Sequence, residues 1–325
     1  MIETEVGSVR VLAVLCNWNG GHYIGRCLDA LARQTLSLYE IVVVDNGSCD
    51  GSPRWIQAHY PRVRLLQNPT NLGVAVGYNQ GMESIECTYV LILNADVFVA
   101  DDYVERGVQF LEARNDAGAV TGRFYEEATD REIGGGFFLS PQMRIRPCSS
   151  HGGYQEVFGT TAAAALFRSD ALEQVRIGNN EVFDASYFAY GEDIDLSWRL
   201  QLAGWKIYCE RTIFAHHLGS GSLNGRIRFF QKPAFFQRHT LKNRYLTVIK
   251  NLTAGLALRL LPSLFLFELI LWPYLLLRQP FRFPYLMSCW IEVIRLLPTT
   301  LRKRSEIQHR RCGSSSYIRR FITGL

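Results

Sequence analysis

The sequence predicts an α/β fold in which a mostly parallel β-sheet is covered by helices. Strand-like and helix-like patterns alternate through the first third of the 325 residues, which is typical of βαβ units. Two short hydrophobic runs, residues 41–44 and 90–93, have the composition of strands buried on both faces, and Asp45 and Asp96 follow them closely. Ligands of open α/β sheets bind beyond the carboxyl ends of the strands, so both aspartates are expected to face a ligand crevice.

The elements of this alternating region follow from hydrophobic periodicity and from helix start signals. Apolar residues at helical spacing predict an amphipathic helix at 22–34, and Ser52 followed by Pro53 marks a helix start. The predicted elements in chain order are a strand at 9–16, a helix at 22–34, a strand at 40–44, a helix from 52, a strand at 62–67, a strand ending at Asp96, and a helix that Asp101 or Asp102 caps and that ends near 113.

Glycines recur every four residues between the third and fourth strands, at Gly73, Gly77 and Gly81. This spacing allows either a close approach of a helix to the sheet or an approach of backbone N–H groups to a phosphate. The pattern is not GxGxxG, and the chain contains no GxxxxGK[ST] motif, which argues against a nucleoside triphosphatase.

The middle of the chain changes character. Residues 134–136 and 144–153 are predicted to be loops, 158–167 a strand, and 192–202 a helix that Gly204 ends as its C′ residue. The helix opens on the acidic pair Glu192 and Asp193. A strand at 205–210 then leads to two adjacent histidines and a Gly/Ser-rich loop.

The charge balance divides the chain near residue 225. Residues 1–225 carry 17 Lys/Arg and 27 Asp/Glu, whereas residues 226–325 carry 18 and 3. We therefore predict an α/β catalytic domain at 1–225 and a basic, apolar, helical region at 226–325. In that region basic residues flank long apolar stretches, which favours an anionic membrane surface over nucleic acid as the partner.

The apolar stretch at 260–277 is borderline as a membrane-spanning helix. It is interrupted by Pro262 and Pro273 and contains Glu268, whereas a span needs about 20 apolar residues. We favour helices that lie in the membrane plane or insert partly over a true span. The alternative is a buried helical hairpin of a soluble protein.

The N-terminus and the cysteines favour the cytoplasm. Residues 1–5 are acidic and lack the basic region that opens a signal peptide. The eight cysteines include no CxxC pair and no metal-finger spacing, so reduced thiols are expected. Together with the basic, apolar region at 226–325, this predicts a protein at the cytoplasmic face of the cell membrane.

Three carboxylates, Asp45, Asp96 and Asp193, could divide three tasks around one ligand. One could bind a nucleobase or ribose, one could hold a divalent cation on a diphosphate, and one could take a proton from an attacking hydroxyl. Structural roles compete with each task. Asp45 could cap the following turn, and Glu192 and Asp193 could complement the dipole of their helix.

Five segments occur in an order that resembles one protein family: Asn17-Trp18-Asn19, VVVDNGS at 42–48, NLGVAVGYN at 71–79, LILNAD at 91–96, and the stretch 183–205. The chain resembles, over about residues 9–250, the inverting family-2 glycosyltransferases with a GT-A fold, and especially the rhamnosyltransferase-like branch that builds bacterial surface polysaccharides. The resemblance implies a Rossmann-like mixed sheet covered by helices, and a glycosyltransferase of the hexosyltransferase type.

The resemblance also implies a role for individual residues. Asp193 matches the general base, with Glu192 beside it, and Asp96 with His217 matches the metal site for Mg²⁺ or Mn²⁺, His216 being the alternative histidine. A helix N-terminus is expected to keep Asp193 ionised and to weaken its affinity for protons. Arg199 and Trp205 belong to the same signature and have a possible structural role. The positions that match the donor-binding segments are Asn17, Asn19, Asp45, Asn71, Asn79, Asn94 and Asp96.

Asn94 departs from the family's DxD motif, because it stands where the first aspartate is expected. It leaves one anionic metal ligand in that motif. The implied partners are a nucleotide-diphosphate sugar, with dTDP-rhamnose as the first guess, and a glycan or polyprenyl-linked glycan acceptor. A non-catalytic nucleotide-sugar-binding scaffold is the alternative. A nucleotidyltransferase is disfavoured, because the turn after the first strand lacks the required glycine-rich signature with a basic residue.

Overall fold

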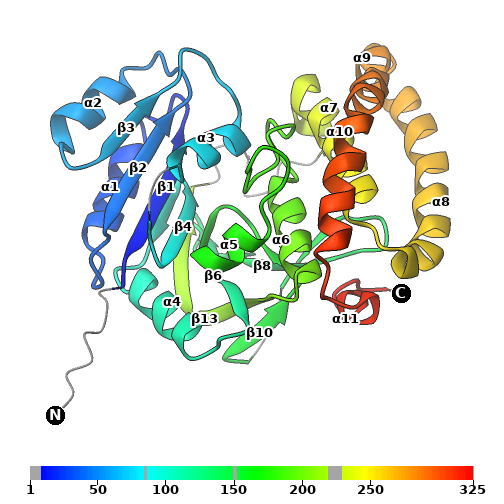
Figure 1. The fold of residues 1–325 in the computed structure, drawn as a ribbon. Coiled ribbons are helices and arrows are strands. Elements are labelled where there is room, and N and C mark those ends of the chain that lie inside the picture. Colours follow the sequence, from blue (N-terminus) through cyan, green and yellow to red (C-terminus); the bar gives the residue numbers. More distant parts are fainter. Residues whose placement is uncertain (1–8, 84–85, 149–151, 219–228, 325) are drawn as a thin grey trace.

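The computed structural model describes residues 9–83, 86–148, 152–218 and 229–324. Within them a ten-stranded mixed sheet forms the centre of the molecule, and a three-stranded sheet lies beside it. The strand order of the large sheet is β10-β13-β6-β12-β4-β1-β2-β3, with β5 paired to β13 and β7 to β6. Figure 1 shows this sheet with helices around it, and the helices α7 to α10 packed at one side of the molecule.

The parallel part of the sheet confirms the predicted alternation of strands and helices. Its strands are β1 (Val11–Asn17), β2 (Glu40–Asp45), β3 (Arg64–Gln67) and β4 (Tyr89–Asn94), and its helices are α1 (Ile24–Ala32), α2 (Ser52–His59), α3 (Val74–Gly81) and α4 (Tyr103–Glu112). Strand β1 pairs with both β2 and β4 in parallel, with Asn17 opposite Asp45 and Cys16 opposite Asn94. The carboxyl ends of these strands therefore meet at one edge, as predicted.

The other half of the large sheet is mixed. Strand β12 (Ala164–Arg168) runs antiparallel between β4 and β6 (Ala117–Glu126), and β13 (Lys206–His217) runs parallel to β6. The remaining strands of this sheet are β5 (Val97–Val99), β7 (Glu132–Gly134) and β10 (Tyr154–Val157). Strand β13 is longer than predicted and carries both histidines at its end.

Two predictions for the middle of the chain are wrong. Residues 134–136 and 144–153 were expected to be loops, but they contribute β7, β8 (Gly136–Leu139) and β9 (Ile145–Pro147). Gly135 has φ +157°, and a Cβ atom there would lie 1.9 Å from the carbonyl oxygen of Gly122, so the glycine run lets two strands approach closely. The second wrong prediction is the single strand at 158–167, because this stretch forms two strands, β11 (Gly159–Thr160) and β12.

The glycines of α3 allow a close contact between this helix and β1. A Cβ atom on Gly77 would lie 2.5 Å from Sγ of Cys16, and one on Gly81 would lie 2.3 Å from Cγ1 of Val14. Of the two interpretations of the glycine spacing, the close approach of helix and sheet is therefore confirmed for these two residues.

The last third of the chain is helical, as predicted. Its elements, with the two helices that precede β13, are α5 (Ser169–Gln174), α6 (Glu192–Leu202), η2 (Phe229–Gln231), α7 (Ala234–Asn251), α8 (Ala254–Arg278), α9 (Phe283–Met287), α10 (Cys289–His309) and α11 (Ser315–Arg319). The predicted domain boundary near 225 lies outside the described residues. The core is continuous across it, because Leu241 of α7 and Val293 of α10 belong to the same buried cluster as Val14 of β1.

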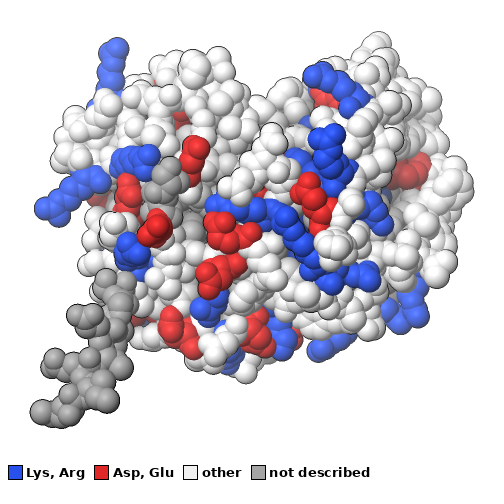
Figure 2. All heavy atoms as spheres, in the orientation of Figure 1, with Lys and Arg blue, Asp and Glu red and all other residues white. Residues whose placement is uncertain are grey.

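Charged side chains are unevenly distributed over this helical part. Lys and Arg side chains gather on the visible face over α10, whereas the surface over α8 carries few charges (Figure 2). Helix α8 is the one helix in the described residues that is long and apolar enough to cross a membrane, and 17% of its apolar window is buried.

Candidate active site

The first group of predicted site residues surrounds Asp45 at the end of β2. The Nδ2 atom of Asn17 donates to Oδ1 of Asp45 at 2.7 Å, and the backbone N–H of Ser48 donates to Oδ2 at 2.9 Å. Asn19 accepts a hydrogen bond from the N–H of Cys49 and donates its own N–H to Oγ of Ser48. Asp45 thus caps the following turn, and Asn17, Asn19 and Asp45 form one polar cluster at the sheet edge.

The second group joins the end of β4 to the end of β13. The Nε2 atom of His217 lies 3.2 Å from Oδ1 of Asp96, and both side chains are mostly buried. His216 faces the opposite side of its strand, where its Nε2 atom lies 3.3 Å from Oδ1 of Asp130. The structure therefore brings His217, and not the alternative His216, to Asp96.

Tyr78 of α3 lies between these groups and the acidic start of α6. Its hydroxyl donates to Oδ1 of Asn94 at 2.9 Å. Burial raises the pKa of Tyr78 well above its ordinary value, and the nearby charges of Glu192, Asp96 and Asp193 raise it further. The buried phenol therefore lies within electrostatic range of all three acids. Our sequence reasoning missed this residue, although it stands inside the NLGVAVGYN segment.

The turn before Glu192 and Asp193 has an unusual backbone. Tyr190 has φ +68° and Gly191 has φ +92°, so two successive residues adopt the left-handed conformation, which is uncommon for tyrosine. This turn starts α6 directly, and Asp193 Oδ1 accepts a hydrogen bond from the N–H of Ile194 at 2.8 Å. The Oε2 atom of Glu192 is buried and has no hydrogen-bond partner among the described residues.

Both acids have raised pKa values. Burial, together with the charge of Asp193, raises the pKa of Glu192 to about 8, and burial raises the pKa of Asp193 to about 6. Backbone N–H groups and Lys232 lower the pKa of Asp193, but they do not outweigh its loss of water. The helix N-terminus lowers the pKa of Asp193, as expected, but burial raises it by more, so the net proton affinity is higher than that of an exposed aspartate. At pH 7 Asp193 is still mostly ionised, whereas Glu192 is mostly protonated.

Lys232 is a second residue that the sequence reasoning missed. It follows η2, and its Nζ atom lies 3.2 Å from the ring centroid of Tyr190. Burial lowers the pKa of Lys232 to about 8, although the charges of Glu192 and Asp193 raise it. The lysine thus supplies a cation to the buried acid pair. Nothing in the sequence near 232 distinguishes this lysine from the others of the basic region.

The other predicted residues make structural contacts. Asn79 donates to the carbonyl of Phe183 and accepts from the N–H groups of Val182 and Phe183, and Asn71 accepts from the N–H of Gly73. Arg199 pairs with Asp195 at 2.9 Å, both side chains being almost fully buried, and Trp205 donates to Gln174. None of these contacts joins Asn71 or Asn79 to Asp96, Glu192 or Asp193.

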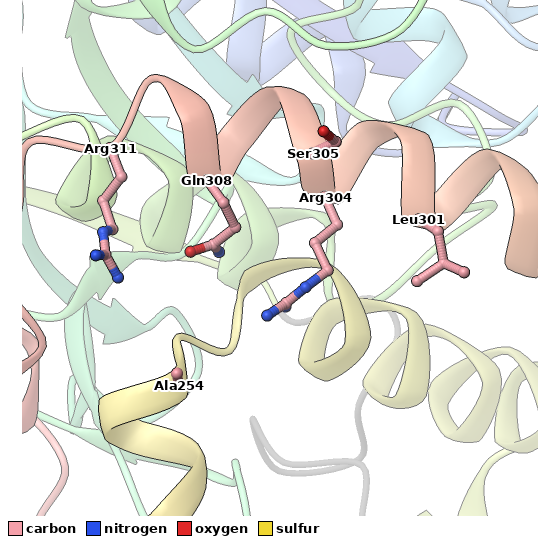
Figure 3. A pocket seen from close by; sticks show the side chains of 6 residues that line it. All are labelled: Ala254, Leu301, Arg304, Ser305, Gln308 and Arg311. Carbon is pink, nitrogen blue, oxygen red and sulfur yellow. The ribbon is translucent and has the colours of Figure 1, made fainter.

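A separate cavity of about 480 Å³ lies between the start of α8 and the second half of α10. Figure 3 shows Arg304 of α10 and Arg311, which follows the end of α10, pointing into it. Arg304 donates to the carbonyl of Ile249 at 2.7 Å and Gln308 donates to that of Asn251, so these side chains satisfy carbonyls at the end of α7. This cavity contains none of the candidate site residues.

Comparison with known proteins identifies relatives of this chain. It is 26% identical over 215 residues to the glycosyltransferase GlyG of Streptococcus pneumoniae, an alignment that covers 63% of this chain and 70% of the relative. It is also 26% identical over 241 residues to the N-acetylglucosaminyl-diphospho-decaprenol L-rhamnosyltransferase of Mycobacterium tuberculosis, covering 63% and 75%.

Solved structures show the same fold. TarS of S. aureus, residues 1–349, matches with a TM-score of 0.59 and 14% identity over 93% of this chain and 89% of that chain. GalNAc-T7 with UDP, GalNAc and Mn²⁺ matches with a TM-score of 0.60 and 14% identity over 76% and 48%. The profile of glycosyl transferase family 2 matches residues 13–176, about half of the chain, and this protein is therefore a member of glycosyl transferase family 2.

Proposed function

We propose that this glycosyltransferase moves a sugar from a nucleoside-diphosphate donor to a glycan hydroxyl in one displacement, with inversion at the anomeric carbon. The observation that carries the proposal is the buried Tyr78, whose hydroxyl donates to Asn94 at the end of β4 and which lies within electrostatic range of Asp96, Glu192 and Asp193. This supports one site that includes the acid after β4 and the acids at the start of α6.

In this mechanism Asp193 is the general base. The acceptor oxygen forms a bond to the anomeric carbon while the bond from that carbon to the diphosphate oxygen breaks. The proton of the acceptor hydroxyl goes to Asp193, and the bonding electron pair leaves with the diphosphate. A pKa of about 6 leaves Asp193 ionised at neutral pH and gives it more affinity for a proton than an exposed aspartate has. Asp193 keeps part of its surface accessible, so an acceptor hydroxyl can reach it.

The residues present fit a divalent cation at Asp96 and His217. A carboxylate and an imidazole nitrogen only 3.2 Å apart offer an oxygen and a nitrogen ligand on one side of a single position. The described residues contain no group of three or more His, Cys, Asp or Glu side chains that could hold a metal ion. This suits Mg²⁺ or Mn²⁺, which keep water and substrate phosphates as further ligands. Such an ion would offset negative charge on the departing diphosphate.

The cluster around Asp45 supports a nucleobase site. Asn17, Asn19 and Asp45 lie at the carboxyl ends of β1 and β2, where ligands of such sheets bind. Asp96, which follows the neighbouring strand β4, would then lie beside the diphosphate of the donor. The polar cluster is tied together by hydrogen bonds before any ligand is bound, so its groups are held in place for a donor.

The sugar and the acceptor are proposed from the relatives. The Mycobacterium relative is an N-acetylglucosaminyl-diphospho-decaprenol L-rhamnosyltransferase, a name that specifies rhamnose and a decaprenol-linked acceptor. We therefore propose rhamnose, from dTDP-rhamnose, and a polyprenyl-linked glycan in surface polysaccharide synthesis.

An acceptor of this kind requires a position at the membrane. Helix α8 exposes large apolar side chains, among them Leu258, Phe265 and Ile270, and α10 adds Ile291 and Ile294. Glu268 of α8 faces the protein, where it accepts hydrogen bonds from Arg244 and Tyr245 of α7. This arrangement supports α8 lying in the membrane plane at the cytoplasmic face, because a span would carry Glu268 and its partners into the lipid.

The experiment that tests the proposed chemistry is the variant Asp193→Asn. We expect it to lose sugar transfer by about 10²–10⁴-fold, the usual contribution of a general base, while binding of the donor's nucleoside diphosphate with Mn²⁺ persists. A panel of nucleotide sugars in thermal-shift assays, with and without Mn²⁺, first identifies the donor. Full activity of Asp193→Asn would overturn the base assignment. A wild-type protein that binds donors but transfers none would support the scaffold alternative.

A further inference from the structure

Helix α7 presents a buried polar face to the catalytic part of the molecule. Lys242, Asn243, Thr247, Lys250 and Asn251 are all buried, and their spacing places them on one side of the helix. Buried lysines are rare unless they are paired. A helix of the C-terminal region that buries such a row must use it to bind a defined partner.

The partner of this face is the segment from Asp184 to Asp195, which leads into α6 and contains the proposed base. Lys242 donates to the carbonyl of Ser186 at 2.7 Å, and the hydroxyls of Thr247 and Tyr187 lie 2.8 Å apart. Asn243 donates to the carbonyls of Ala189 and Tyr190, at 3.0 and 2.7 Å. Several turns of α7 thus bind the part of this segment that precedes α6.

Lys250 closes the row with a buried ionic contact. Its Nζ atom, which is fully buried, pairs with Asp184 and lies 2.9 Å from Oδ1 of Asp195. Asn251 donates to the same Oδ1 atom at 2.7 Å. Asp195 stands two residues after Asp193 on α6, so one lysine connects the start of this segment to the helix that carries the base.

The backbone between these contacts is strained. Tyr190 and Gly191 are both left-handed, and a tyrosine in this conformation persists only when its surroundings hold it there. Asn243 supplies such a restraint through the carbonyl of Tyr190, and Lys232 covers the Tyr190 ring. The strained turn immediately precedes Glu192 and Asp193, so its conformation fixes where their side chains point.

We propose that Asn243 and Lys250 of α7 are positioning residues that hold the 184–195 segment in the conformation that aims Asp193 at the acceptor hydroxyl. The proposal rests on the assignment of Asp193 as base. It makes α7 part of the catalytic machinery, although this helix follows the family match at residues 13–176 and belongs to the region predicted to bind the membrane.

The charges around the base give this proposal a specific signature. The groups that face Glu192 and Asp193 are Cys16 of β1, Tyr78 of α3, Lys232 after η2, Tyr190, and Asp195 on α6 itself. The negative charge of Asp195 raises the pKa of Glu192. Loss of the Lys250 cation would leave the negative charge of Asp195 less compensated. The pKa of the Glu192–Asp193 pair should then rise.

The test uses Asn243→Leu and Lys250→Met in the full chain, with the donor sugar that the wild-type protein transfers. We expect kcat to fall by about 10²-fold in each, the cost of a misplaced reacting group, with affinity for the nucleoside diphosphate of that donor and for Mn²⁺ unchanged. Hydrogen exchange of residues 184–195 should become faster while that of β1 to β4 stays the same. In Lys250→Met the acid limb of the pH profile, which is the fall of kcat/KM at low pH, should also move to higher pH.

Lys303→Met is the matched control. Lys303 is a buried lysine that pairs with Asp184 and Glu181 at 2.8 Å, and among the described residues it forms no ion pair with Asp195. It should destabilise the protein without moving the acid limb. An equal shift in Lys303→Met, or unchanged kcat and exchange in Asn243→Leu, would overturn the proposal. If Lys250→Met does not fold, Asn243→Leu decides it. An active Asp193→Asn would instead refute the base assignment.

Discussion

Oδ1 of Asp96 lies 3.2 Å from Nε2 of His217, although the two residues are more than a hundred positions apart in the chain. Asp96 follows β4, and His217 ends β13, whose last residues pair with β5 just after Asp96. The neighbouring His216 pairs with Asp130 on the other face. The alternation of side chains along β13 therefore selects which histidine can share a cation with Asp96.

This relationship predicts a difference between the two histidines. His217→Ala should weaken the Mn²⁺-dependent binding of the donor's nucleoside diphosphate by at least about tenfold, because it removes one of two protein ligands at the proposed site. His216→Ala should leave this binding unchanged and serves as the matched control. Titration calorimetry with that nucleoside diphosphate at several Mn²⁺ concentrations measures both. Equal losses in the two variants would contradict the assignment.

The acid pair predicts a distinct pH dependence. Asp193, with a pKa of about 6, must be ionised to act as base, so kcat/KM should fall as pH decreases through about 6. Glu192, with a pKa of about 8, keeps its proton at pH 7. Glutamine resembles protonated glutamate, so Glu192→Gln should keep most of its activity at pH 7. Loss of activity in Glu192→Gln as severe as in Asp193→Asn would mean that Glu192 is the base.

The sequence predicted the parts of the site that depend on strand ends. Asn17, Asp45 and Asp96 could be placed because parallel strands bring their carboxyl ends to one edge whatever the details of packing. Tyr78 could not be assigned to the site in this way, since a tyrosine between apolar helix residues is more often a core residue. Its role follows from the direction of its hydroxyl toward Asn94, which periodicity does not specify.

Tertiary burial explains the remaining differences. The sequence places Asp193 at a helix N-terminus, which lowers a pKa, but the helices packed around it remove water and reverse the sign. Lys232 and the polar face of α7 reach the base from positions distant in the chain. Polar residues at helical spacing ordinarily indicate a solvated face, so a buried polar face on α7 has no signature in one sequence.

The contact between α3 and β1 predicts that adding a single methyl group to α3 at Gly77 destabilises the protein. Gly77→Ala places a Cβ atom 2.5 Å from Sγ of Cys16, so α3 must move and should lose about 1–3 kcal/mol of stability despite the better helix propensity of alanine. Gly153→Ala, where a Cβ atom meets nothing within 4 Å, is the control. Urea denaturation measures both. A Gly77→Ala protein as stable as wild type would show that α3 packs less tightly.

The membrane proposal is best tested by substitutions on α8. A truncation near residue 250 would also remove Lys303, a partner of Asp184, and Arg304, which donates to the end of α7. Such a protein could lose activity for reasons unrelated to the membrane. Phe265 and Ile270, with 67% and 61% of their surface exposed, can be replaced without disturbing the core.

The double variant Phe265→Ser/Ile270→Ser should bind anionic phosphatidylglycerol vesicles at least about tenfold more weakly, because burying each side chain contributes about 1.5–3 kcal/mol. Raising the salt concentration should weaken wild-type binding too, since the basic residues beside this face contribute electrostatically. Tyr154→Ser, which replaces an aromatic side chain on β10 that is 51% exposed, should have no effect. Vesicle co-sedimentation measures all three proteins. Undiminished binding of the double variant would remove α8 from the membrane contact, and the acceptor would then have to reach Asp193 without it.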